Sequence, residues 1–119
     1  MDDRKIRGAK GEEIAAAYLE ARGFRVIAKN WLHRLGEIDL IVERGDEVRF
    51  IEVKLRYTRT YGHPEAAITG LKLRHLARAV ECWLETQHPR PRRYQADAIA
   101  ITLVSGQKPE IYWIQAIFV

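Results

Sequence analysis

The chain has 119 residues, 47% of them hydrophobic and 30% charged, a composition that fits one packed domain and excludes an intrinsically disordered chain. A single cysteine excludes an intrachain disulfide and a cysteine-based zinc cluster, and no apolar run approaches the roughly 20 residues of a membrane-spanning helix. With 20 Lys and Arg against 16 Asp and Glu, the net charge is +4 at pH 7, which permits an anionic partner without identifying it. We therefore expect one domain over residues 1–119, with no membrane partner and, because the N-terminus is polar and unlike a secretory signal, in the cytoplasm.

The N-terminal quarter predicts a helix followed by a strand. Residues 8–22 are rich in alanine and lack proline, and Gly23 follows them at the position of a helix C-cap. One face of this helix carries a carboxylate at the upper end of an apolar stripe: Glu12, Ala15, Ala16 and Leu19. Residues 24–30 alternate as a strand does, and residues 31–36 are expected to form a connection.

The segment around Gly45 and Asp46 predicts a β-hairpin. Two β-rich runs, residues 37–44 and 47–55, flank this dipeptide, and a glycine at the first central position suits a two-residue type II′ turn. Such a turn fixes the cross-strand pairs as Arg44–Glu47, Ile41–Phe50, Asp39–Glu52 and Glu37–Lys54. The two acids Asp39 and Glu52 then share one face, with Cβ atoms about 4.5–5.5 Å apart. The other face is expected to be mainly core: Ile38, Leu40, Val42, Val53, Ile51 and Arg49.

A second helix is expected after the hairpin. Residues 58–64 predict a loop, and a long helix follows, with an interruption at Thr69 and Gly70 and a stop at residues 88–91, which contain two prolines. The side chains expected on its buried face are Leu73, Leu76, Ala77, Val80, Trp83 and Leu84.

The C-terminal third predicts two more strands. Residues 94–104 and 110–118 are apolar and β-branched, and residues 105–109 between them are typical of a turn. A strand, then a helix, then a strand implies a right-handed parallel crossover. We therefore expect an α/β fold with a central mixed five-stranded sheet flanked by helices.

The acidic pair on the hairpin suggests a metal site. Two carboxylates directly opposite each other repel and raise each other's pKa, whereas a divalent cation between them removes this cost. Mg²⁺ takes one or two carboxylates together with backbone carbonyls and waters, which suits Asp39, Glu52 and the carbonyl of Val53. Lys54 projects to the same face, where its ammonium can orient water and counter charge on a phosphate. Glu12 can supply a further carboxylate through water.

Each of these residues also has a purely structural interpretation. Alternating charges, as in Glu52-Val53-Lys54, mark many exposed strand faces, and Glu37 with Lys54 can form a surface salt bridge worth under about 1 kcal/mol. Glu12 can simply complement a helix N-terminus. The catalytic interpretation is favoured because one register satisfies the turn chemistry, the apolar pattern and the convergence of Asp39, Glu52 and Lys54.

The basic residues gather in three stretches, which could be solvated faces or contacts to an anionic partner. The stretches are Lys54, Arg56 and Arg59 with Tyr57 and Tyr61; Lys72, Arg74 and Arg78; and Arg90, Arg92 and Arg93. In a nucleic-acid-binding protein, Arg56, Arg59, Lys72 and Arg74 would contact backbone phosphates, which position a substrate without reading its sequence.

Several linked motifs carry a resemblance to a known family. They are Gly8-Ala9-Lys10-Gly11-Glu12 with Ala15 and Leu19, Asn30-Trp31, Gly36-Glu37-Ile38-Asp39-Leu40-Ile41, Phe50-Ile51-Glu52-Val53-Lys54-Leu55-Arg56, and Lys72. With these motifs the chain resembles the YraN-like family of small, uncharacterised bacterial proteins. That family is grouped with the restriction-endonuclease-like, PD-(D/E)xK nuclease superfamily and is similar to archaeal Holliday junction resolvases.

The resemblance implies a restriction-endonuclease-like core and a role for each acidic residue. Asp39 would occupy the superfamily's Asp position, Glu52 its (D/E) position and Lys54 its Lys position, while Glu12 would match the helix-borne Glu of the resolvase-like branch. One motif departs from the family: near the fourth strand the family shows Arg-Phe-Asp, and this chain has Gln95-Ala96-Asp97, with Arg93 as the nearest arginine. The role of Asp97 is therefore left open.

The acidic pair and the family resemblance together favour a Mg²⁺- or Mn²⁺-dependent endodeoxyribonuclease that acts on DNA, including branched or structured DNA. Kinship with nucleases that pair to cut two strands also suggests a homodimer. A second interpretation is a non-catalytic nucleic-acid-binding module on the same scaffold. A third is a protein-interaction subunit that uses the apolar segment 114–119 as a docking or dimer edge.

Overall fold

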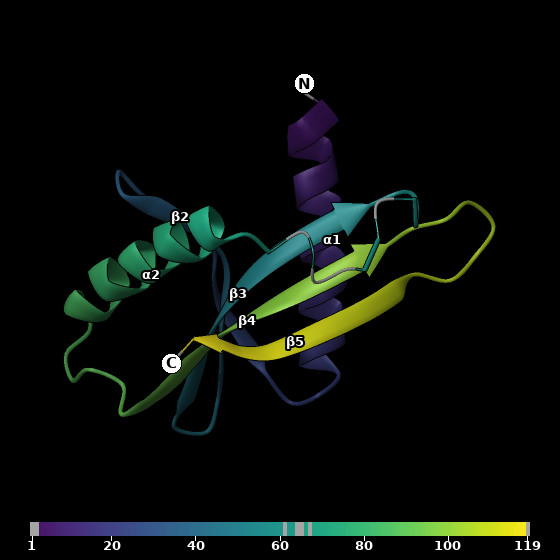
Figure 1. Ribbon diagram of the computed structural model, residues 1–119. Helices are drawn as coiled ribbons and strands as arrows, with labels where there is room; N and C mark the ends of the chain where they lie inside the picture. The colour runs from purple at the N-terminus through teal and green to yellow at the C-terminus, as the bar shows by residue number, and fades with distance from the viewer. Residues whose placement is uncertain (1–2, 61, 64–65, 67, 119) are drawn as a thin grey trace.

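The structure is a computed structural model that describes residues 3–60, 62–63, 66 and 68–118, with side chains from residue 9 onward. Seven elements follow one another (Figure 1): α1 (Asp3–Glu20), β1 (Arg25–His33), β2 (Gly36–Arg44), β3 (Glu47–Arg56), α2 (Gly70–Glu85), β4 (Arg93–Thr102) and β5 (Glu110–Phe118). Tyr61, Pro64 and Val119, which belong to segments assigned in the sequence analysis, lie outside the described residues. No helix of the described part is long and apolar enough to cross a membrane.

The five strands form one mixed sheet in the order β1-β2-β3-β4-β5. All neighbours are antiparallel except β3 and β4, which are parallel and are joined through α2. The expected α/β fold with a mixed five-stranded sheet is confirmed, and its arrangement is consistent with a restriction-endonuclease-like core.

The two helices cover opposite faces of the sheet, and each closes its own core (Figure 1). The core under α1 contains Ala15, Ala16, Leu19, Phe24, Leu40, Val42, Ile51, Ile99 and Ile101. The core under α2 contains Ile38, Ile41, Val48, Phe50, Leu76, Ala79, Val80, Trp83, Leu84 and Ala96. Because strand side chains alternate between faces, β2 and β3 supply both cores.

The turn of the predicted hairpin is confirmed. Arg44 pairs with Glu47 and Ile41 with Phe50, as the sequence requires for a two-residue turn. Gly45 has a φ of 64°, whereas Asp46 has no positive φ, as in a type II′ turn.

Several predicted boundaries were too short or misplaced. α1 begins at Asp3, ahead of the predicted start at residue 8, and β1 continues to His33, so that only residues 34–35 connect it to β2. β1 passes through Asn30 with a φ of 49°, a left-handed conformation that asparagine tolerates. The interruption predicted at Thr69 and Gly70 is instead the start of α2, where the Thr69 side chain accepts a hydrogen bond from the Lys72 amide.

Ile38 lies on the face opposite to the predicted one. It packs in the α2 core together with Ile41, whereas Leu40 and Val42 pack under α1. The alternation breaks here because the β2–β3 ladder ends at the Leu40–Ile51 pair and because Asn30, with its left-handed φ, lies in β1 between the partners of Leu40 and Ile38. This irregularity falls at Asp39.

Asp97 is a fully buried structural carboxylate in β4. It accepts hydrogen bonds from Arg49 Nη1, Trp113 Nε1, Gln95 Nε2 and the Ala116 amide, at 2.8–3.0 Å. Arg49 on β3 therefore supplies the guanidinium that the sequence lacks next to Asp97. A buried carboxylate needs a charged partner and hydrogen bonds, and this network supplies both. Asp97 therefore has a structural role, in which it connects β3, β4 and β5.

Candidate active site: an acidic pair and two lysines in one cleft

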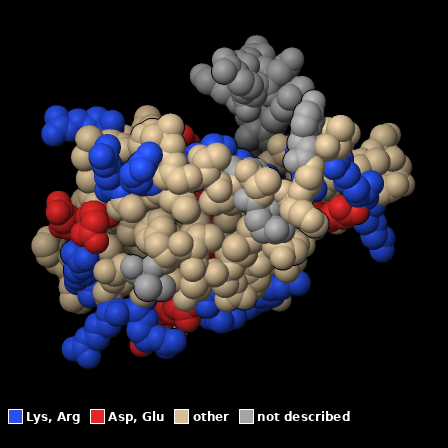
Figure 2. Space-filling model, in the orientation of Figure 1, with Lys and Arg blue, Asp and Glu red and all other residues tan. Residues whose placement is uncertain are grey.

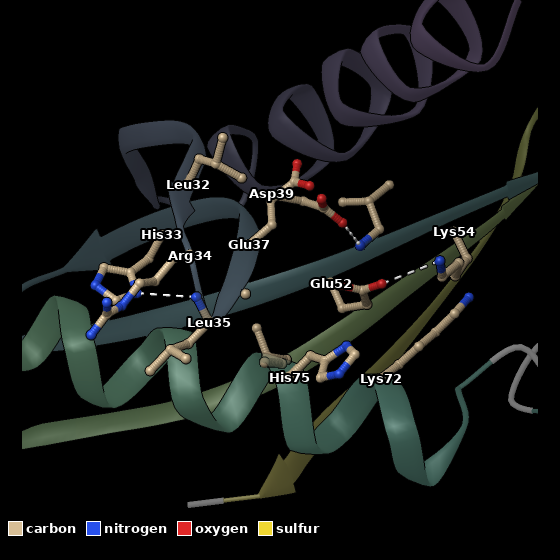
Figure 3. Close-up of a pocket in the computed structure, with 13 residues that line it drawn as sticks. Leu32, His33, Arg34, Leu35, Glu37, Asp39, Glu52, Lys54, Lys72 and His75 are labelled. Carbon is tan, nitrogen blue, oxygen red and sulfur yellow. Dashed lines mark hydrogen bonds and ion pairs between the residues drawn. The ribbon is translucent and has the colours of Figure 1, made fainter.

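A cleft of about 600 Å³ lies between the end of the β1–β2 hairpin, the middle of β3 and the N-terminal half of α2 (Figure 3). It is lined by Leu32, His33, Arg34, Leu35, Gly36, Glu37, Asp39, Glu52, Val53, Lys54, Lys72, His75 and Leu76. Three of the four predicted catalytic residues, Asp39, Glu52 and Lys54, therefore meet in one cavity, together with Val53 and Lys72.

The cleft exists because β2 separates from β3. The ladder between these strands ends at Leu40–Ile51, so the predicted backbone pairs Asp39–Glu52 and Glu37–Lys54 are not part of it. Beyond this point the side chain of Asp39 replaces the missing strand partner, because its Oδ2 accepts a hydrogen bond of 2.7 Å from the Val53 amide. The Asp39 side chain is thereby held at the backbone of Val53, the residue that follows Glu52 in β3.

The carboxyl group of Asp39 is in an unfavourable environment for a negative charge. Burial and, next, the charge of Glu52 raise its pKa to about 8, and Glu37 and Glu12 act in the same direction. The hydrogen bond from Val53 opposes the shift and does not compensate it. A cation close to this carboxyl group would favour its ionised form.

Glu52 shares its neighbourhood with two lysines (Figure 3). Lys54 Nζ lies 3.3 Å from Glu52 Oε1, so Lys54 pairs with Glu52 and not with Glu37, the partner considered in its structural interpretation. Burial acts to lower the pKa of Lys54, but its contacts with Lys72 and Glu52 outweigh it and raise the pKa. Burial and the contact with Lys54 lower the pKa of Lys72 to about 8. Lys54 is thus the amine that stays charged, and Lys72 is the one that loses its proton more readily.

Glu12 is a buried residue of α1 and does not line the cleft. Its position near the middle of α1 (Asp3–Glu20) rules out the alternative that it complements a helix N-terminus. A Cβ added at the preceding Gly11 would lie 3.3 Å from Leu55 Cβ, so α1 packs closely on β3 at this point. Burial raises the pKa of Glu12, while a hydrogen bond with Asn30 opposes the shift. The charge of Glu12 helps to raise the pKa of Asp39, although Glu12 does not line the cavity that contains Asp39.

The four predicted phosphate contacts divide into two groups. Arg56 donates to Thr102 and to the carbonyl of Gly62, and Arg59 forms an ion pair with Glu110, so both hold neighbouring parts of the fold. Lys72 lines the cleft and Arg74 is exposed on α2. In the view of Figure 2 the basic side chains lie mostly around the margin of the molecule and form no single continuous patch.

Sequence reasoning missed several cleft residues, chiefly Glu37 as a neighbour of Asp39, and Arg34, Leu35 and His75. They come together because the β1–β2 hairpin rests on α2. The sequence itself shows only a glycine at position 36. In the structure a Cβ on Gly36 would lie 2.4 Å from the carbonyl oxygen of His75, so only glycine permits this contact.

The donor atoms in the cleft limit the metals that it can hold. Within the described residues no three His, Cys, Asp or Glu side chains are close enough to form a metal site. The lining also contains Glu37, His33 and His75, but they form no such group with the acidic pair. Asp39, Glu52 and the neighbouring backbone oxygens are a set of hard oxygen donors. This set does not suit Zn²⁺, which prefers nitrogen and sulfur, and it fits Mg²⁺ or Mn²⁺, which keep waters and bind substrate phosphate.

Comparison with known proteins places the chain in a family. A family model described as "Uncharacterised protein family UPF0102" matches residues 11–101. The chain belongs to this family. UPF0102 is the YraN-like family that the sequence motifs resemble, and the matched residues include Glu12, Asp39, Glu52, Lys54 and Lys72.

Relatives in UPF0102 match over nearly their full lengths. A UPF0102 protein of Leifsonia xyli subsp. xyli is 42% identical over 110 residues, which is 92% of this chain and 93% of the relative. One from Geobacter sulfurreducens is 40% identical over 114 residues, or 96% of this chain and 89% of the relative. One from Mycolicibacterium gilvum is 36% identical over 118 residues, or 98% and 96%.

Proposed function

We propose that this UPF0102 chain is a metal-dependent endonuclease of the PD-(D/E)xK superfamily, which hydrolyses phosphodiester bonds of DNA in the cytoplasm. The observation that carries the proposal is the meeting of Asp39, Glu52 and Lys54 in one cleft, with Asp39 anchored on the Val53 amide at 2.7 Å. The α/β fold and the UPF0102 membership support it.

Asp39, Glu52 and the carbonyl of Val53 would hold Mg²⁺ or Mn²⁺. In an extended strand the N–H and C=O of one residue point to the same side, so the Val53 carbonyl faces the gap that its amide shares with Asp39. Only Oδ2 of Asp39 is engaged by this amide, which leaves Oδ1 for a cation. When bound, the ion would stabilise the charge that develops on the scissile phosphate.

The remaining residues act on water and phosphate directly. Lys54 is held by Glu52, and its ammonium can donate to the attacking water or to a phosphate oxygen. Lys72, adjacent to it on α2, can bind a neighbouring phosphate oxygen. Glu12 would adjust the charge of Asp39 from the other face of the sheet. Water is the nucleophile, so no covalent enzyme intermediate is required.

The proposal is tested by DNA cleavage with Mg²⁺ or Mn²⁺ on duplex, single-stranded and four-way-junction DNA. We expect Asp39→Asn to reduce cutting at least about 100-fold, as loss of a charge-stabilising group typically does, and EDTA to abolish it. Asp46→Asn is the matched control, since Asp46 is an exposed acid in the turn between β2 and β3 and is paired with Arg93. Equal cutting by the wild type and Asp39→Asn would contradict the catalytic assignment.

The ion pair between Lys54 and Glu52 favours a second candidate, a nucleic-acid-binding module that needs no metal, because Lys54 neutralises Glu52 without one. This module would bind DNA with strong salt dependence, and Glu52→Gln would leave binding intact. Calorimetric titration with Mn²⁺ separates the candidates: heat that disappears in Asp39→Asn supports the nuclease, and its absence in the wild type supports the module.

A further inference from the structure

The end of the β1–β2 hairpin exposes two leucines beside the cleft. Leu32 is 76% exposed and Leu35 is 44% exposed, and both line the cavity that contains Asp39 and Glu52. Figure 3 shows them at the hairpin, across the cavity from Lys54 and Lys72. Single exposed leucines are common on proteins, but two at one hairpin end beside a polar cleft call for a binding partner.

The hairpin end is held in a fixed position. The Leu35 amide donates to His33 Nδ1 at 3.2 Å, and the His33 ring stacks on Trp31 with centroids 5.9 Å apart. Gly36 rests directly on the carbonyl of His75 in α2. The leucines are therefore presented on a braced turn, which lowers the entropic cost of using them in binding.

The charges around the leucines favour a nucleic acid as the partner. Arg34 lies between them in the sequence and lines the same cavity, and Lys54 and Lys72 lie across it. The acids of the lining, Glu37, Asp39 and Glu52, include the two proposed to hold the cation. Apolar side chains flanked by cations suit a ligand with flat apolar faces and a negatively charged backbone, which describes bases and phosphates. Proteins that kink or open nucleic acids insert leucine and similar side chains between bases in this way.

We propose that Leu32 and Leu35 form an apolar wedge that stacks on exposed bases. The cleft then prefers DNA in which the strands separate to DNA that is a continuous duplex. This inference rests on the proposed function, because it takes the cleft as the place where DNA binds. It assigns the choice of substrate to the hairpin end and the chemistry to β2 and β3.

The test compares binding to a forked duplex and to a fully paired duplex of equal length, by gel shift in EDTA so that no cleavage occurs. The variant is the double substitution Leu32→Ser with Leu35→Ser. Tyr112→Ser is the matched control, because Tyr112 is 49% exposed on β5, at the opposite edge of the sheet. Leu32→Ala, which leaves the turn untouched, serves as a second variant where the double substitution fails to fold.

We expect the wild type and the Tyr112 variant to prefer the fork, and the leucine variant to bind the fork about tenfold more weakly while its affinity for duplex changes less than about twofold. Permanganate, which oxidises unstacked thymines, should react less with the unpaired thymines at the fork when the wild-type protein covers them, and this protection should be absent with the leucine variant. Equal weakening on both substrates, equal wild-type affinity for both, or a change of oligomeric state in the leucine variant would overturn the wedge.

The outcomes also separate this inference from the proposed function. A wild-type protein that cuts DNA with Mn²⁺ but shows no preference for the fork retains the nuclease assignment and loses the wedge. A wild-type protein that prefers the fork through its leucines but never cuts retains the wedge and loses the nuclease assignment. A protein that binds neither DNA loses both.

Discussion

The carboxyl group of Asp39 is held by the Val53 amide and lies near three further acids, Glu52, Glu37 and Glu12. Its pKa of about 8 in the folded protein compares with about 3.9 in an unfolded chain. Below pH 4 the group is protonated in both states, and between about pH 4 and 8 only the unfolded chain ionises it. The stability of the metal-free protein therefore falls as pH rises through this window and levels off above it.

Asp39→Asn should consequently stabilise the metal-free protein in the upper part of this range. We expect its melting temperature at pH 8 to exceed that of the wild type by roughly 4 °C or more, equivalent to about 1 kcal/mol or more, and the difference to shrink at pH 5. Thermal unfolding followed by circular dichroism in EDTA measures it. Asp46→Asn should show no such pH-dependent gain, and a lower melting temperature of Asp39→Asn at pH 8 would show that this carboxylate stabilises the fold.

At the scale of elements, the site depends on the contact between the β1–β2 hairpin and α2. This contact is set by Gly36, whose missing side chain lets the strand approach the His75 carbonyl. The same contact closes one wall of the cleft and carries the leucines at the hairpin end.

Gly36→Ala should therefore disturb both stability and the site. A Cβ would lie 2.4 Å from the His75 oxygen and 3.2 Å from its carbon, and both are backbone atoms, so the hairpin or α2 must move. We expect a loss of about 1–3 kcal/mol, measured by urea unfolding, and weaker Mn²⁺ binding. Gly70→Ala is the control, because a Cβ there meets nothing within 4 Å and alanine favours the helix. Equal stabilities of the two variants would contradict this account of the hairpin.

For the molecule as a whole, a metal that binds only the folded state raises the melting temperature. At a concentration of 100 times the dissociation constant the gain is about 2.7 kcal/mol. We expect Mn²⁺ to raise the melting temperature of the wild type, and EDTA to reverse the rise. Glu52→Gln should remove most of the effect, whereas Glu110→Gln should keep it, since Glu110 pairs with Arg59 on the surface. An equal rise in both variants would place the ion elsewhere.

The fold was largely predictable from the sequence, because its signals are local. The Gly45-Asp46 turn fixed the β2–β3 register. Helical spacing identified Leu76, Val80, Trp83 and Leu84 on the buried face of α2, whereas the predicted Leu73 and Ala77 are only half-buried and the buried Ala79 was missed. The grouping of Asp39, Glu52 and Lys54 followed from that register, although their roles in catalysis stay predictions.

What the sequence did not reveal depends on contacts between distant elements. The ladder between β2 and β3 ends one pair before Asp39, and no local pattern encodes where two strands separate. Lys72 reaches Lys54 only because α2 crosses back over the sheet. Likewise, Arg49 meets Asp97 because β3 and β4 are parallel neighbours, 48 residues apart in the chain.

The positions of the three tryptophans give the protein built-in optical reporters. Trp31 stacks on His33 beside the cleft, Trp83 lies in the core under α2, and Trp113 donates to the buried Asp97 with the Arg49 guanidinium over its ring. Each indole thus has a different polarity around it and reports on a different layer. Intrinsic emission spectra of single-tryptophan variants can therefore follow the hairpin, the α2 layer and the docking of β5 separately as the chain unfolds.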